Sequence, residues 1–173
     1  MKELFIGMAL VFLDVNVGFN SHTFDVLPDF VGYFLMMRGF EALAAESPYF
    51  EKSRPLAMGM AVYGTALYAV NALAVTIQGQ FLSFCVGVPS LVAGLLLGYW
   101  TVSGIRDVER RQNRDLDGEK LQSFWQPMAM IQGITYACGW IPLVGAVGSI
   151  AALVMNVCFL TALYRTMNLY DGR

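Results

Sequence analysis

The lysine and arginine residues of this 173-residue chain are confined to four groups along the sequence. The 11 cations fall at Lys2, 38–54, 106–120 and 165–173, and the stretches between these groups are long and apolar. If each stretch forms a pair of membrane-crossing helices, all of the cations lie on one side of the membrane, as the positive-inside rule requires. The charge pattern therefore predicts a polytopic membrane protein with both termini in the cytoplasm.

The composition supports this class of protein. Hydrophobic residues make up 57% of the chain and charged residues 14%, whereas soluble domains carry roughly 25% charged residues. Six crossings of about 20 residues would use ~120 residues, so the length predicts one compact membrane domain and no separate soluble domain. The net charge of −2 does not suit a nucleic-acid partner.

The apolar runs predict an all-α bundle of six transmembrane helices arranged as three helical hairpins. The expected helices are 3–18, 28–45, 56–77, 81–105, 123–139 and 142–168, and 106–120 is expected to be a charged cytoplasmic loop. We expect the first run to be a permanent helix and not a cleaved signal peptide, because Asp14 and Asn16 follow its apolar core and no small-residue cleavage site appears.

Small residues recur at four-residue spacing in the three later helices. They are Ser90, Gly94 and Gly98, then Ala129, Gly133 and Ala137, then Gly148 and Ala152, which lead to Asn156. Such faces allow helices to pack closely in lipid, and packing within the monomer is expected, with a dimer contact through Gly94 and Gly98 as the alternative.

Three amides and three cysteines stand out on these otherwise apolar helices. Asn71, Gln132 and Asn156 are expected to form interhelical hydrogen bonds. A disulfide between Cys85 and Cys138 is permitted by the topology, but isolated cysteines in membrane helices are usually small packing residues.

The half of the chain that faces away from the cytoplasm has one polar cluster, and it lies in the first hairpin. The cluster contains the only histidine, His22, together with Asn16 and the aspartates Asp14, Asp25 and Asp29. In one interpretation it is an external loop in which an aspartate stabilises the start of the second helix. In the other it lines a water-accessible pocket for a cation or polar solute. Because no spaced set of metal ligands is present, we predict no metal and no cofactor.

Asp14 is the member of this cluster that is hardest to explain as a loop residue. Counting from Leu4, it lies ~15 Å into a hydrocarbon core about 30 Å thick, where an ionised carboxylate needs a partner. Arg38 is the candidate partner, at a similar depth on the second helix. Alternatively, Arg38 extends to the cytoplasmic headgroups, and Asp14 stays protonated or lies at the outer rim. Separately, Arg38 and Glu41 are expected to pair locally near the cytoplasmic face. The hypothesised solute or ion site is therefore Asp14, Asn16, His22, Asp25, Asp29 and Arg38.

The first hairpin also resembles known sequences. Leu13-Asp14, together with Leu27-Pro28-Asp29-Phe30-Val31-Gly32-Tyr33 and the following Arg38-Gly39-Phe40-Glu41, is similar to the opening of small uncharacterised multi-pass proteins of Gram-positive bacteria. The resemblance covers about the first 55 residues. It implies a bacterial cytoplasmic (inner) membrane location and no known activity. In architecture alone, the expected bundle is similar to the substrate-binding components of energy-coupling-factor vitamin transporters, whose ligand-binding motifs this chain lacks.

No catalytic motif of the HExxH, GxSxG or Walker type is present, so an enzyme is the least favoured class. The sequence favours a small non-enzymatic integral membrane protein that binds or transports a small solute or ion through the first hairpin. The alternative is a membrane scaffold or accessory subunit. The expected partners are the lipid bilayer and either a small polar solute or cation, or another membrane protein. A pocket lined by Asp14, Asn16, His22 and Asp29 would favour solute binding, and a closed hairpin would favour the scaffold.

Overall fold

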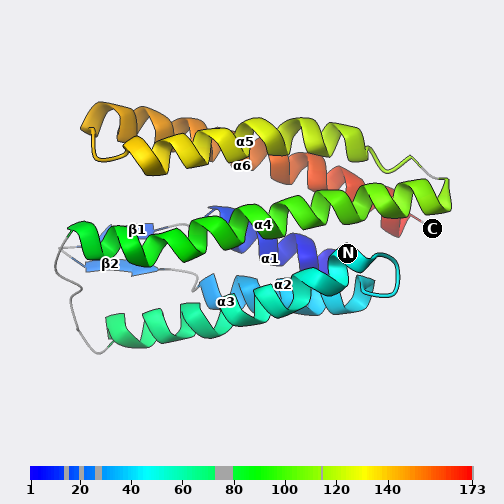
Figure 1. The fold of residues 1–173 in the computed structure, drawn as a ribbon, viewed down its shortest axis with the longest axis horizontal. Coiled ribbons are helices and arrows are strands. Elements are labelled where there is room, and N and C mark those ends of the chain that lie inside the picture. The colour runs from blue at the N-terminus through cyan, green and yellow to red at the C-terminus, as the bar shows by residue number, and fades with distance from the viewer. Residues whose placement is uncertain (14–15, 20–21, 26–28, 73–79, 114, 173) are drawn as a thin grey trace.

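The computed structural model describes residues 1–13, 16–19, 22–25, 29–72, 80–113 and 115–172. Within these ranges the chain forms six helices and one short β-hairpin (Figure 1). The elements are α1 Lys2–Leu13, β1 Asn16–Phe19, β2 His22–Asp25, α2 Asp29–Leu43, α3 Pro48–Ala72, α4 Gln80–Gln112, α5 Gly118–Cys138 and α6 Pro142–Asp171. The prediction of a six-helix bundle is thus confirmed for the described residues, and the β-hairpin is an addition that was not predicted.

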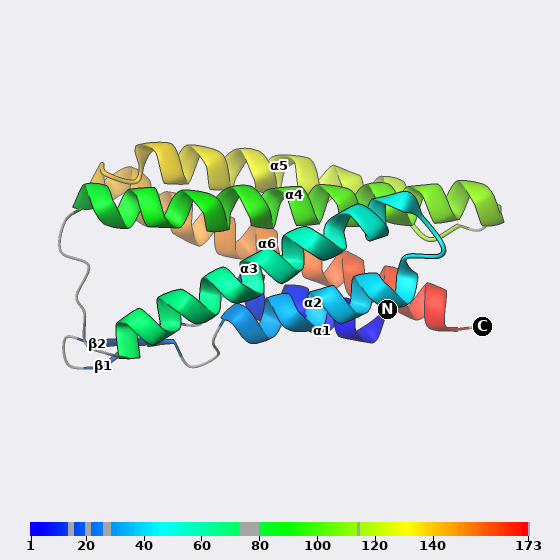
Figure 2. The same cartoon turned by 60° about the horizontal axis from the view of Figure 1, so that its bottom comes forward.

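The six helices lie side by side and close into a ring. Each helix packs on the next one along the chain, and α6 packs on α1. Both termini, the α2–α3 turn and the α4–α5 connection lie at one end of the bundle, whereas the β-hairpin and the α5–α6 turn lie at the other (Figures 1 and 2). All the described lysines and arginines belong to segments at or near the first end, which we call the charged end. We call the opposite end the hairpin end.

Two of the described helical segments are long and apolar enough to cross a membrane by length and composition, Cys85–Gln112 and Pro142–Asp171. By this measure the structure does not support six transmembrane helices. The helices α1 and α2 have 12 and 15 residues, which at 1.5 Å per residue gives lengths of ~18 and ~22 Å, less than the ~30 Å hydrocarbon core of a bilayer. Both are shorter than the predicted helices 3–18 and 28–45.

The first helix ends before Gly18 because the residues beyond Leu13 favour a strand. Asn16, Val17 and Gly18 are weak helix formers, and they form β1 together with Phe19. Antiparallel pairing with β2 places Asn16 opposite Asp25 and Phe19 opposite His22. Part of the stretch expected to be an external loop is therefore a hairpin.

Two other predicted boundaries differ at the charged end. The helix α3 begins at Pro48 instead of residue 56, because Ser47 accepts a hydrogen bond at Oγ from the N–H of Tyr49 (3.4 Å) and proline suits the first helical position. The helix α4 continues to Gln112, so most of the predicted loop 106–120 is helical. Its last turns are stabilised by the Asp107–Arg111 pair (3.1 Å) and by cations near the negative end of the helix dipole.

Side chains tie the connections at the charged end to neighbouring helices. The hydroxyl of Ser47 donates to Asp107 (2.8 Å), which joins the α2–α3 turn to α4. The carbonyl of Leu116, in the α4–α5 connection, accepts a hydrogen bond from Thr166 of α6 (3.0 Å). Next to it, Asp117 forms an ion pair with Arg165 (2.7 Å). The charged end is therefore a fixed part of the fold and not a set of loose loops.

Glycines allow a close helix contact between α1 and α2. A Cβ atom on Gly7 would lie 2.6 Å from the carbonyl oxygen of Gly32, and one on Gly39 would lie 2.6 Å from Cβ of Leu4. The spacing of small residues in the sequence predicted such faces only in the later helices. There, Gly98 does pack tightly, because a Cβ on it would lie 2.8 Å from Nε1 of Trp125, but a Cβ on Gly133 would meet nothing within 4 Å.

The α1–α2 contact can be tested with Gly39→Ala, with Gly59→Ala as a control. The added methyl at position 39 overlaps Leu4 and should cost about 1–3 kcal/mol of stability. Position 59 on α3 has nothing within 4 Å, so the methyl there should be neutral or add up to about 1 kcal/mol through helix propensity. Thermal unfolding in detergent, followed by circular dichroism, measures both, and equal shifts in Tm would contradict the close contact.

Candidate functional site

The helix α1 runs antiparallel along the C-terminal half of α6. The N-terminal amine of Met1 lies 4.0 Å from Asp171, the rings of Phe5 and Tyr164 are 5.4 Å apart, and those of Phe12 and Phe159 are 5.8 Å apart. The helix α1 ends at Leu13, near the level of Asn156. From there α6 continues to Pro142, roughly 21 Å further toward the hairpin end at 1.5 Å per residue.

A cleft of about 510 Å³ opens where α1 ends. Phe12 and Leu13 of α1 and Leu91 of α4 form part of its wall, and α5 and α6 supply the rest. Five of the lining residues carry polar side chains: Gln132, Thr135, Tyr136, Ser149 and Asn156. The cleft therefore combines an apolar wall with neutral hydrogen-bonding groups, an arrangement typical of small-molecule sites.

Asn156 connects three helices at the floor of this cleft. Its Nδ2 donates to the carbonyl oxygen of Phe12 (2.8 Å), and its Oδ1 accepts from Nε2 of Gln132 (2.7 Å). The last four carbonyls of a helix lack partners within that helix, and Phe12 supplies one of these four. Asn156, which is buried, thus caps α1 from a neighbouring helix.

The predicted interhelical hydrogen bonds of Gln132 and Asn156 are confirmed. That the two amides bond to each other and to the end of α1 was not predicted. A signal was present, because Gln132, Thr135 and Tyr136 share one helical face, as do Ser149, Ala152 and Asn156. In the sequence, the second of these faces was interpreted as a stripe of small packing residues. The side chain of the third amide, Asn71, lies outside the described residues.

The structure describes the hypothesised first-hairpin site only in part. Asp14 lies outside the described residues, and for Asn16, His22 and Asp25 only the strand backbone is described. Asp29 is the first residue of α2. None of the six predicted site residues is among the described residues that line the cleft, although Leu13, which does line it, directly precedes Asp14 in the sequence.

Arg38 lies far from the start of α2. It is exposed and is 3.5 Å from Glu3, near the beginning of α1. Asp29 is nine residues away along α2, roughly 14 Å at helical rise. The local pair with Glu41 does not form, because Glu41 pairs with Arg54 (3.0 Å). The predicted pair between Arg38 and Asp14 remains a prediction, since Asp14 is not described.

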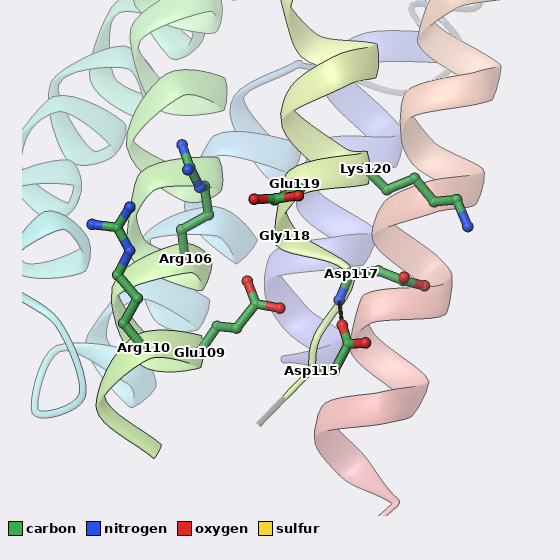
Figure 3. A pocket seen from close by; sticks show the side chains of 8 residues that line it. All are labelled: Arg106, Glu109, Arg110, Asp115, Asp117, Gly118, Glu119 and Lys120. Atoms are coloured by element: carbon green, nitrogen blue, oxygen red, sulfur yellow. Dashed lines mark hydrogen bonds between the residues drawn. The ribbon is translucent and has the colours of Figure 1, made fainter. Parts of the chain in front are cut away.

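A second, charged cleft of about 610 Å³ lies between α4 and α5 at the charged end. Figure 3 shows Arg106, Glu109 and Arg110 on α4, with Asp115, Asp117, Glu119 and Lys120 on the connection and the start of α5. Several of these groups are used within the protein. Arg106 donates to Gln122 and Glu109 accepts from the N–H of Leu116. We therefore interpret this cleft as the folded α4–α5 connection.

The part of the chain that the structure describes contains no metal-binding group of side chains and no disulfide. There, no group of three or more His, Cys, Asp or Glu side chains is placed to hold a metal ion. The cysteines Cys85, Cys138 and Cys158 are free thiols, and Cys85 is exposed. The structure thus contains no Cys85–Cys138 disulfide.

Comparison of the chain with protein-family models, with curated proteins and with solved structures gives no match. The resemblance of the first hairpin to small multi-pass proteins therefore stays a prediction. The function of this protein has to be inferred from the geometry of the bundle and of its clefts.

The role of Asn156 can be tested with Asn156→Leu. The substitution leaves the carbonyl of Phe12 and the amide of Gln132 without their partner, and we expect a loss of about 2–3 kcal/mol, since buried unsatisfied groups cost roughly 1–3 kcal/mol each. Asn168→Leu, at an exposed position of the same helix, is the matched control and should be close to neutral. Thermal unfolding compares the two, and an equally mild effect would show that the cap of α1 contributes little.

Proposed function

We propose that this protein is a small non-enzymatic integral membrane protein that binds a small solute in the cleft beside the end of α1. Its six helices are embedded in a bacterial cytoplasmic membrane, with the charged end in the cytoplasm. The observation that carries the proposal is the cleft itself. It lies toward the hairpin end, away from the cations, and is lined by neutral hydrogen-bonding groups.

The outer surface of the bundle supports the membrane location. Every helix exposes large apolar side chains, among them Ile6, Phe34, Val62, Val92, Ile134 and Val147, one from each helix in order. Apolar patches of this extent are unfavourable in water and normal in lipid. The cations gather at the charged end, which supports a cytoplasmic location for that end under the positive-inside rule.

The packing below the cleft supports binding over passage through the bundle. Phe12 and Phe159 meet edge to face beside the Asn156 amide. Toward the charged end, Leu97, Phe159 and Leu163 are fully or almost fully buried in the core. A solute that enters from the hairpin end would therefore meet a filled core. Asp14, which follows Leu13 directly, remains a proposed contributor to the mouth of the site together with Asn16, His22 and Asp25, whereas Asp29 is described on α2 and does not line the cleft.

A membrane scaffold is the second candidate function, and the outward face of α5 favours it. The predicted small-residue face Ala129, Gly133 and Ala137 is not filled at its centre, because a Cβ on Gly133 would meet nothing within 4 Å. Small residues on an open helix face permit close packing of another helix. Crosslinking in native membranes tests this function: a dimer that Gly133→Leu abolishes would favour it, and monomers alone would remove it.

The proposed orientation predicts which cysteines can be labelled from outside intact cells. With Cys138 and Cys158 replaced by alanine, Cys85, which is exposed on the half of α4 toward the hairpin end, should react with a membrane-impermeant maleimide. Gln112→Cys at the charged end, in a background without Cys85, should react only after the membrane is permeabilised. The reverse pattern would place the charged end outside, and labelling of both sites in intact cells would argue against a membrane barrier between them.

The cleft can be filled to test solute binding. Ala152 lines the cleft, so Ala152→Trp should remove any small molecule that co-purifies from native membranes and is detected by mass spectrometry. Ala146→Trp, an exposed site on the same helix, should retain it. A bound molecule that survives Ala152→Trp, or that is lost equally from both variants, would show that the cleft is not the binding site.

A further inference from the structure

We infer that the cleft takes an uncharged ligand that carries an N–H and a C=O group side by side, as an amide, lactam or ureide does, and that Gln132 recognises this edge. The inference rests on the proposed function, because it names the class of solute that the same cleft would hold. It follows from the orientation of two amides and from the absence of charged side chains among the described lining residues.

The orientation of Gln132 is fixed by a chain of hydrogen bonds that starts on the backbone. The carbonyl oxygen of Phe12 can only accept, so the atom of Asn156 that faces it must be Nδ2. The other end of the Asn156 amide is then Oδ1, which can only accept, so Gln132 must present Nε2 to it. The usual uncertainty of an amide flip is therefore removed for both residues.

This orientation determines what Gln132 offers to a ligand. One of its two N–H donors is used on Asn156, which leaves the second N–H and the carbonyl oxygen Oε1. The oxygen Oε1 and the N–H on the same side of the amide form an edge that is complementary to another amide-like edge, and we place the bond to Asn156 on the opposite N–H. A ligand that lacks either group would leave one side of Gln132 unpaired, and unpaired polar groups in a desolvated site are costly.

The lining of the cleft also selects against charge. Its polar members in the described residues are amides and hydroxyls, and the wall is completed by apolar residues such as Leu13, Leu91 and Leu153. A charged ligand would lose hydration without gaining a counter-charge from the described lining residues, which is unfavourable. The cleft volume of about 510 Å³ suits a small molecule. The apolar wall would contact the hydrocarbon part of the ligand.

The test uses a single thiol placed in the cleft. Ser149 lines the cleft and is exposed, so Ser149→Cys, in a background with the three native cysteines replaced by alanine, reports access. Its reaction rates are measured with a neutral, a cationic and an anionic methanethiosulfonate reagent, each relative to the rate with a free thiol. We expect the neutral reagent to react at least about threefold faster, on this relative scale, than either charged reagent.

Protection by a matched pair of small molecules then tests recognition of the amide edge. The probes are 2-pyrrolidinone, which has adjacent N–H and C=O groups, and cyclopentanone, which has only the C=O group. At equal millimolar concentrations, the lactam should slow modification of Ser149→Cys at least about twofold and the ketone should not. In a second variant that also carries Gln132→Leu, the two probes should act alike, whereas an added Gln126→Leu, an exposed glutamine on the same helix, should preserve the difference.

Each outcome separates the inference from the proposed function. If the cationic reagent reacts fastest, the cleft is a cation site to which Asp14 contributes, and the inference fails while solute binding stands. If both probes protect equally with Gln132 in place, recognition of an amide edge is wrong. If no reagent reaches Ser149→Cys while an otherwise identical single-Cys85 protein reacts, the cleft is closed to solvent, and the proposed function fails together with the inference.

Discussion

The hydrogen bond from Asn156 to the carbonyl of Phe12 is the contact on which the hairpin end of the bundle depends. It allows α1 to stop at Leu13, inside the bundle, although the last carbonyls of a helix have no partner of their own. Buried or lipid-exposed carbonyls without a partner cost several kcal/mol in a membrane. Because Asn156 also holds Gln132, the same amide fixes the end of one helix and the polar floor of the cleft. The position of the cleft thus follows from the place where α1 can end.

Backbone groups at helix ends have different kinds of hydrogen-bond partner in different parts of the molecule. At the charged end, ionised and hydroxyl side chains bond to the backbone of the connections between helices, as Thr166 does for the carbonyl of Leu116 and Glu109 does for its N–H. These side chains can remain charged because the segment meets water. At the level of Asn156, midway along α6, the described contacts use neutral amides, which lose less hydration when they are buried. The charged end thus uses ionised and hydroxyl groups, and the middle of the bundle uses neutral amides.

The sequence predicted six helices because each one is an apolar run bounded by charges or turn residues. That pattern is visible in the hydropathy along the chain and needs no knowledge of tertiary contacts. It misplaced the ends of α1, α3 and α4 because those ends depend on local chemistry. The capping of α3 by Ser47 and the Asp107–Arg111 pair on α4 are small effects that hydropathy does not register. It also did not locate the cleft, since Gln132 and Asn156 meet only when three helices pack together. The first-hairpin cluster drew attention because its polar residues are neighbours in the sequence, whereas those of the cleft are brought together by the fold.

The close contact between α1 and α2 explains how so short a helix is held in place. With Gly7 and Gly39 at the crossing, backbone atoms of α1 and α2 approach more closely than any larger residue would permit. On its other side, α1 is held by aromatic pairs with α6 and by the Asn156 bond. The cleft opens beside Leu13 because α1 ends there while α6 continues, which is why we place the solute site at this level of the bundle.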